Sequence, residues 1–223
     1  MSDFKNLKNE FVELLIAGEE SEAVERSNAV LDEGIEPTNF FEQIFTPAME
    51  SVGDKFGRLE IFMPELIQAA ETAQAISEQA LQPRLRKNGD SDSLKRGKIL
   101  LASVRGDLHD IGKNMVALML QVNGFEIVDM GVDVDTRTII DRAREDKVDI
   151  VGLSSLMTTS MPYMKEALEM RAGFGLGDQF AIIVGGAPIT EEYCSDIDAD
   201  AYGNDAVDGV TKCLSLIKEW KSK

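Results

Sequence analysis

Apolar and polar residues alternate along the first ninety residues with the spacing of amphipathic helices. The stretch 3–18, DFKNLKNEFVELLIAG, ends at a glycine and carries apolar side chains at three- and four-residue steps. These side chains belong to Phe4, Leu7, Phe11, Leu14 and Leu15. Similar patterns cover 19–34, 36–56 and 63–81. Four helices with short connections are typical of an antiparallel bundle, which we predict here.

The pattern changes after a polar, glycine-punctuated stretch at 82–98, which we interpret as a linker between domains 1–90 and 91–223. Beyond it, short apolar runs alternate with helical stretches such as 114–124 and 136–147. The apolar runs are 98–104, 125–131, 149–155, 180–186 and a short last one at 200–203, before a closing helix at 206–220. This rhythm predicts an α/β domain with a five-stranded parallel sheet and helices on both faces.

Composition narrows the classes of partner. The chain has 40 acidic and 23 basic residues, a formal net charge of −17, so it repels nucleic acid and anionic lipid. Partner proteins with basic faces fit this charge. The sequence shows neither a membrane-spanning apolar run nor the layout of a signal peptide, and its two cysteines, Cys194 and Cys213, are predicted to be buried free thiols. We therefore expect a cytoplasmic protein.

The candidate chemistry follows the predicted strands. In a parallel α/β sheet, ligands bind outside the carboxyl ends of the strands. Three loops there are GDLHDIG at 106–112, SSLMTTS at 154–160 and GGAP at 185–188. Together they offer an imidazole, carboxylates, small hydroxyls and bare backbone at one rim of the sheet.

His109 is the only histidine in the chain and lies between two carboxylates. One imidazole nitrogen can bind a metal while the other donates to Asp107, whereas we expect Asp110 to be a solvated carboxylate. A protein zinc site does not fit, because it needs three or four ligands. A metal that brings most of its ligands in a macrocycle needs only one. The alternative is an ordinary surface or core histidine.

The loop motifs resemble those of cobalamin-binding proteins. The family signature Asp-x-His-x-x-Gly is matched by Asp107, His109 and Gly112. GLSSLMTTS is similar to the second motif, Ser-x-Leu, at Ser154 and Leu156, and Val184 to Gly186 resembles the third. The stretch 52–66, VGDKFGRLEIFMPEL, resembles the helical cap of the same proteins. The resemblance implies a four-helix cap followed by a Rossmann-like (flavodoxin-like) cobalamin-binding domain.

The resemblance also implies residue roles. A corrinoid would bind with its lower nucleotide detached from cobalt, and His109 would be the lower axial ligand, with Asp107 and Ser160 as a relay behind it. The nucleotide tail would enter a deep pocket between the sheet and the helices. Phe56 and Met63 would cover the corrin. The family often has Leu at the position of Met63. The residues implied to contact the cofactor are Phe56, Met63, Gly106, Asp107, Leu108, His109, Asp110, Ile111, Gly112, Ser154, Leu156, Thr158, Ser160, Gly185, Gly186, Tyr202 and Gly203.

Alternatives stay open for several of these positions. Phe56 and Met63 fit a bundle core as well, Ser154 and Thr158 fit ordinary turn hydroxyls, and glycine pairs end many strands. Thr159 departs from the Pro of methionine synthase, which puts the rigidity of that loop in doubt.

Among these proteins the chain looks like the small corrinoid proteins of methyltransferase systems. This implies a shuttle that carries a methyl group on cobalt, with a cap that moves, rather than a complete enzyme. The implied partners are a substrate:corrinoid methyltransferase, a second methyltransferase with tetrahydrofolate or coenzyme M as acceptor, and a reductive activator. The implied donors are methylamines, methanol, betaines or methoxylated aromatics. Rival functions are a cobalamin-dependent sensor, a mutase small subunit and a nucleotide-binding domain, for which Gly-x-Gly-x-x-Gly is absent.

Overall fold

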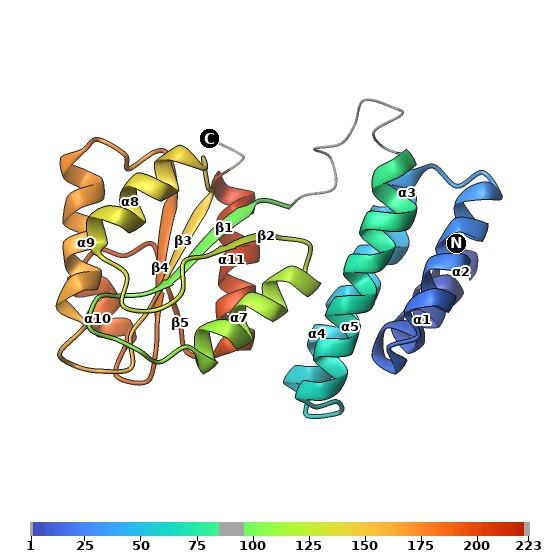
Figure 1. Cartoon of the computed structure of the whole chain (residues 1–223), viewed down its shortest axis with the longest axis horizontal. Coiled ribbons are helices and arrows are strands. Elements are labelled where there is room, and N and C mark those ends of the chain that lie inside the picture. Colours follow the sequence, from blue (N-terminus) through green and yellow to red (C-terminus); the bar gives the residue numbers. More distant parts are fainter. Residues whose placement is uncertain (1, 85–95, 221–223) are drawn as a thin grey trace. The chain divides into compact units, whose positions relative to one another are not determined.

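The structure, a computed structural model, describes residues 2–84 and 96–220 (Figure 1). It contains two compact units, one of Met1–Arg96 with Gln121–Gly124 and the other of Gly97–Leu120 with Phe125–Lys223. The predicted domain boundary at 90/91 lies outside the described residues and stays a prediction. Within those residues, no helix is both long enough and apolar enough to cross a membrane.

The helical unit confirms the predicted helices. Its elements are α1 (Ser2–Ala17), α2 (Glu20–Asp32), α3 (Pro37–Phe40), the π-helical turn η1 (Phe41–Phe45), α4 (Thr46–Gly57), α5 (Met63–Ile76) and the π-helical turn η2 (Ser77–Leu81). The core of the unit is aromatic and aliphatic: Phe11 and Phe40 are fully buried and meet edge to face, with ring centroids 5.3 Å apart. Leu15, Ile44 and Leu66 complete this core with no exposed surface.

The predicted linker at 82–98 is too long at both ends. The last helix of the unit continues through Arg84, because this guanidinium donates to Asn28 at 2.5 Å and to Asp32 at 2.6 Å on α2. At the other end, Lys98 already pairs with Glu126 in the sheet. Contacts with distant parts of the chain therefore order residues whose local composition is typical of a loop.

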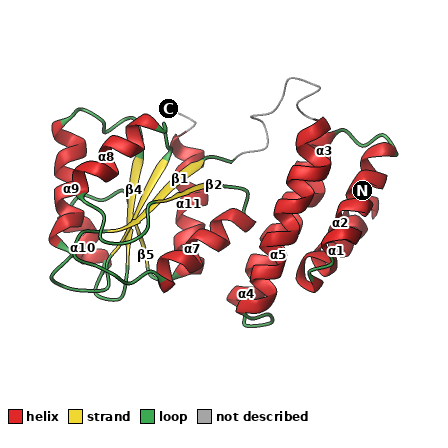
Figure 2. Cartoon of the chain, viewed as in Figure 1, coloured by secondary structure: helices red, strands yellow, loops and turns green. Residues whose placement is uncertain are grey.

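The second unit is the predicted parallel sheet with its helices (Figure 2). The strand order is β2-β1-β3-β4-β5, with every pair parallel. The strands are β1 (Lys98–Ser103), β2 (Glu126–Asp129), β3 (Ile150–Ser154), β4 (Ala181–Gly185) and β5 (Ala201–Gly203). The helices are α7 (Ile111–Val122), α8 (Thr136–Glu145), α9 (Pro162–Gly173), α10 (Glu191–Asp196) and α11 (Ala206–Trp220). From β1 the chain first adds β2 on one side and then β3, β4 and β5 on the other, so the strand order reverses between β1 and β3. Such sheets bind ligands at this point.

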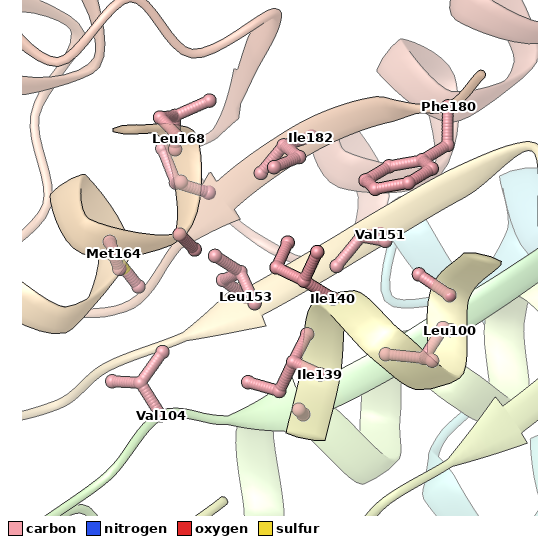
Figure 3. Packing of buried hydrophobic residues seen from close by; sticks show 14 of the residues in the cluster. Leu100, Val104, Ile139, Ile140, Val151, Leu153, Met164, Leu168, Phe180 and Ile182 are labelled. Atoms are coloured by element: carbon pink, nitrogen blue, oxygen red, sulfur yellow. The ribbon is translucent and has the colours of Figure 1, made fainter. Parts of the chain in front are cut away.

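The two faces of the sheet are filled differently. On one face Leu100, Val151 and Ile182, which lie in register on three strands, pack in a closed core with α8 and α9 (Figure 3). On the other face the next row along is Leu101, Gly152 and Ile183. All three residues of this second row line a cavity, so this face is incompletely filled.

Candidate functional site

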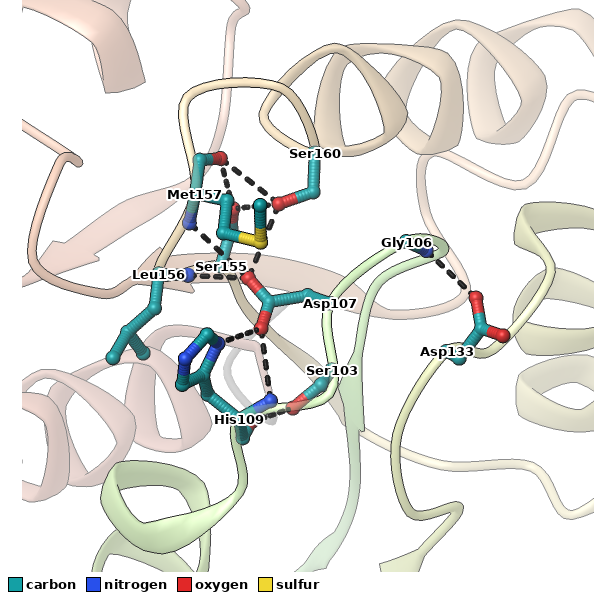
Figure 4. A network of polar contacts seen from close by, with 9 residues as sticks. All are labelled: Ser103, Gly106, Asp107, His109, Asp133, Ser155, Leu156, Met157 and Ser160. Carbon is teal, nitrogen blue, oxygen red and sulfur yellow. Dashed lines mark hydrogen bonds and ion pairs between the residues drawn. The ribbon is translucent and has the colours of Figure 1, made fainter.

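His109 lies on the loop between β1 and α7. Its side chain is 54% exposed, and its Nδ1 lies 2.8 Å from Oδ1 of Asp107 (Figure 4). An ionised carboxylate can only accept a hydrogen bond, so Nδ1 carries the proton. The other ring nitrogen, Nε2, is thereby left with a lone pair for a ligand.

Asp107 is fully buried, and both of its oxygens are occupied. Oδ1 also accepts the main-chain N–H of His109 at 3.0 Å, and Oδ2 accepts the N–H of Leu156 at 2.5 Å and of Met157 at 3.2 Å. The hydroxyl of Ser160, at 3.1 Å, is the fifth donor group when the imidazole Nδ1 is counted. Burial by itself raises the pKa of Asp107, but these hydrogen bonds lower it from its ordinary 3.8 to about 2. The group is therefore a carboxylate at neutral pH.

The predicted grouping of Asp107, His109 and Ser160 is present in the structure, and a second hydroxyl extends it. Ser155 is fully buried, and its Oγ lies 2.7 Å from Oγ of Ser160 (Figure 4). Sequence reasoning missed this residue, although the Ser154–Ser155 pair inside the second motif was a visible signal. That these groups form a relay stays a prediction.

A cavity of about 230 Å³ opens between the sheet and helices α7 and α11. Ser154, Gly185 and Gly203 line it and stand in one register row with Ser103 at the carboxyl edge of the sheet. These small residues add little side-chain volume to the wall. Of the predicted cofactor residues, Gly112, Ser154, Leu156, Gly185, Gly186 and Gly203 line the cavity.

The cavity wall also contains residues that the sequence did not single out. Lys113 on α7 and Cys213 on α11 line it, as does Gly152 on β3. Both cysteines are free and buried, as predicted, and burial raises the pKa of the Cys213 thiol to about 12. A methyl group on Gly152 would come within 2.5 Å of Leu101, so this glycine makes room for the Leu101 side chain, which also lines the cavity.

The structure does not bring all predicted residues to the cavity. Thr158 is exposed and does not line it. Tyr202 packs against the core on the opposite face of the sheet, and its hydroxyl donates to Asn204 at 3.2 Å. Asp110 is exposed, as expected, and accepts a hydrogen bond from Asn114 at 3.1 Å.

Large apolar side chains are exposed beside His109. Leu108 is 72% exposed and Ile111 is 79% exposed, although apolar side chains this large are usually covered when they cluster. In the helical unit, Phe56 and Met63 flank the α4–α5 connection and are half-buried rather than part of its closed core. Their place over a corrin stays a prediction.

The donor set fits a metal that arrives with its own ligands. Among the residues that the structure describes, no group of three or more His, Cys, Asp or Glu could hold a metal ion. His109 does not itself line the cavity, but it offers one nitrogen on the loop that leads into Gly112 and Lys113 of the cavity wall, beside exposed apolar side chains. A corrinoid, whose cobalt needs one protein ligand and whose nucleotide tail needs a pocket, fits these residues.

Comparisons with known proteins identify the family of the chain. The B12 binding domain family matches residues 97–211, and a second family of the same description matches 7–80. The chain is 38% identical to trimethylamine corrinoid protein 2 of Methanosarcina acetivorans over 200 residues, 90% of this chain and 91% of that protein. The chain belongs to the B12 binding domain family of corrinoid proteins.

Two solved structures extend the likeness. A cobalamin-binding protein from Desulfitobacterium hafniense DCB-2 is 33% identical, with a TM-score of 0.71 over 93% of this chain and 97% of that one. The methanol:cobalamin methyltransferase complex MtaBC from Methanosarcina barkeri contains a chain that is 25% identical, with a TM-score of 0.81 over 96% of this chain and 80% of that one.

Proposed function

We propose that this protein is a corrinoid methyl carrier, which takes a methyl group from one methyltransferase and delivers it to another. The observation that carries the proposal is the Asp107–His109 pair, which leaves one imidazole nitrogen free on the loop that leads into the cavity wall at Gly112. When bound, the corrinoid supplies a cobalt ion that accepts and releases the methyl group.

The protein's own residues hold the cofactor and control one proton. His109 would bind cobalt through Nε2, and the cavity between the sheet and α7 and α11 would hold the nucleotide tail. Asp107 keeps the proton on Nδ1 and fixes the direction of the ring. With Nε2 unligated, the ring could take up a proton there, and the neighbouring carboxylate would stabilise the resulting imidazolium. Phe56 and Met63 would shield the bound corrin.

We further propose the partners. A relative is named a trimethylamine corrinoid protein, and a solved relative belongs to a methanol:cobalamin methyltransferase complex. Methylated amines are the donor class that the more similar relatives favour. A second methyltransferase with tetrahydrofolate or coenzyme M, and a reductive activator, complete the proposed system. The net charge of −17 favours partners with basic faces, and the buried free thiols support a cytoplasmic setting.

Cobalamin added to the cofactor-free protein tests the ligation. In electron paramagnetic resonance of the cobalt(II) form, the nitrogen coupling should change from three lines to two when the protein contains ¹⁵N-histidine. A coupling that ignores the label would overturn the assignment of His109. Transfer of a labelled methyl group from the loaded protein to coenzyme M or tetrahydrofolate, with the matching methyltransferase present, separates a carrier from a cobalamin-dependent sensor, which would retain the label.

A further inference from the structure

Asp133, on the segment that joins β2 to α8, forms hydrogen bonds with the main chain shortly before His109. The N–H of Gly106 donates to Oδ1 of Asp133 at 2.7 Å (Figure 4). The N–H of Asp133 donates in turn to the carbonyl oxygen of Asp107 at 2.9 Å. These two hydrogen bonds bracket the backbone angles of Gly106 and Asp107, which decide where the Asp107 carboxylate points.

The backbone of Asp133 is itself unusual. Its φ angle is 52°, in the left-handed region that side chains with a Cβ disfavour and that Asp and Asn tolerate best. Glycine would adopt this angle at lower cost, but it would offer no oxygen to Gly106. The residue thus combines a strained backbone with a specific hydrogen bond, a combination that points to a role for its carboxylate.

A second carboxylate, on Asp129 at the end of β2, forms an ion pair with a residue that follows His109. Both oxygens of Asp129 lie 2.6 Å from Nζ of Lys113, which belongs to the first turn of α7 and is only 4% exposed. A buried ammonium needs such a partner. Oδ1 of Asp129 also accepts the N–H of Gly131 at 2.8 Å, which ties the segment to itself.

We propose that the segment 129–135, here called the brace, positions His109 from outside the Asp107–Ser160 chain. Asp133 fixes the main chain before the imidazole, and Asp129 fixes the helix that follows it through Lys113. Asp129 and Asp133 are positioning residues, since they act through Lys113 and Asp107. The consequence for cobalt ligation rests on the proposed function, whereas the consequence for the imidazole itself does not.

The first test uses the cofactor-free protein. Because His109 is the only histidine, ¹⁵N-histidine gives a single imidazole, and its shifts at a pH where the ring is neutral report which nitrogen carries the proton. In Asp133→Ala we expect the Nδ1–H tautomer to lose population and the Gly106 amide to exchange with solvent about fivefold faster, as for one lost hydrogen bond. Asp133→Asn keeps an oxygen acceptor and should restore both readings.

A matched control separates the brace from simple strain. Asp198 also has a left-handed backbone, with φ 59°, and follows α10 away from this loop. Asp198→Ala should change neither the tautomer nor the exchange of Gly106. For the contact of Asp129 with Lys113, Asp129→Asn leaves a buried ammonium without its charged partner and risks unfolding. The double variant Lys113→Met with Asp129→Asn avoids this, and it should shift the tautomer in the same direction.

The second test uses cobalt(II) cobalamin. We expect the fraction of bound cobalt with histidine coupling to fall about fivefold in Asp133→Ala at unchanged total binding, and to be normal in Asp133→Asn. If Asp133→Ala kept the wild-type tautomer of His109 and the wild-type exchange rate of the Gly106 amide, the proposed positioning role of the brace would be overturned. If the wild-type protein bound no cobalamin, the proposed function would fail, while the measurements on the cofactor-free protein would still decide the role of Asp133.

Discussion

The imidazole Nδ1 of His109 lies 2.8 Å from a carboxylate oxygen of Asp107, a half-exposed ring held by a fully buried acid. The exposed partner can meet a ligand, while the buried partner is fixed by hydrogen bonds from another loop. This pair joins the sequence motif to the chemistry of the site, because it settles which ring nitrogen faces outward.

Asp107→Asn should weaken ligation by His109. An amide keeps the shape of the side chain but removes the negative charge, and a charge-assisted hydrogen bond contributes roughly 1.5–3 kcal/mol. We expect the histidine-coupled fraction of cobalt(II) to fall by one to two decades, with bound corrinoid nearly unchanged because the cavity is intact. Proton uptake on reduction to cobalt(I) should fall as well. Wild-type uptake in this variant would refute the relay and leave the carrier function standing.

The same carboxylate predicts a pH dependence of folding. The folded pKa of Asp107, about 2, lies below its ordinary 3.8, so its contribution to stability is present above about pH 5 and is lost as the pH falls towards 2. The shift corresponds to about 2 kcal/mol in total, of which about 1 kcal/mol should be lost by pH 3. Urea unfolding of wild type and Asp107→Asn at pH 6 and pH 3 checks this. The stability gap between the two proteins should narrow at pH 3, and a constant gap would contradict the prediction.

Gly186→Ala should damage the fold. Its φ is 130°, and a Cβ would stand 1.9 Å from the carbonyl oxygen of Ser155. We expect a loss of about 3 kcal/mol or more in the free energy of unfolding, since backbone on both sides must move. Gly177→Ala is the control, because a Cβ there meets nothing within 4 Å and its φ is not positive. Equal stabilities of the two variants would show that the two loops separate easily.

Gly112→Ala should separate folding from binding. Gly112 lies in the first turn of α7, and a Cβ there meets no atom of the protein within 4 Å. Alanine is the better helix former, so stability should be unchanged or rise by up to about 1 kcal/mol. Because Gly112 also lines the cavity, we expect weaker cobalamin binding in equilibrium dialysis. Unchanged affinity would show that the cofactor does not approach this position.

Ser155→Ala and Ser160→Ala should be coupled. Their hydroxyl oxygens are 2.7 Å apart, and either residue without the other leaves a buried hydroxyl with one partner fewer. We expect each substitution to cost about 1 kcal/mol of stability and the double variant to cost less than the sum. A double-mutant cycle by urea unfolding measures the difference. Strict additivity would mean that the hydroxyls act separately, each through the carbonyl of Met157.

The local part of the site could be predicted from the sequence. Asp107 and His109 are two residues apart, and that spacing by itself allows the contact in an extended loop. The period of apolar residues likewise predicted the helices and the parallel strands, because each element must bury one face or stripe. The order of these strands and helices placed the loops after Val104 and Ser155 at one rim.

The rest of the site depends on how distant segments pair. Ser160 is 53 positions from Asp107, and the N–H donors of Leu156 and Met157 belong to the backbone, which leaves no mark in a residue pattern. The grip of Asp133 on Gly106 is of the same kind.

The sequence by itself determined the elements and the histidine loop, because these follow from spacing along the chain, and the resemblance of its loop motifs to those of cobalamin-binding proteins implied the class of cofactor. The cavity depends on the tertiary structure alone. Ser103, Ser154, Gly185 and Gly203 lie side by side in one row of small residues only in the observed strand register. The tertiary structure also decided that the last helix of the helical unit continues through Arg84, because this side chain is held by α2. The strand register and such long-range contacts depend on the total apolar area that the whole core buries. A short stretch of sequence does not reveal this total.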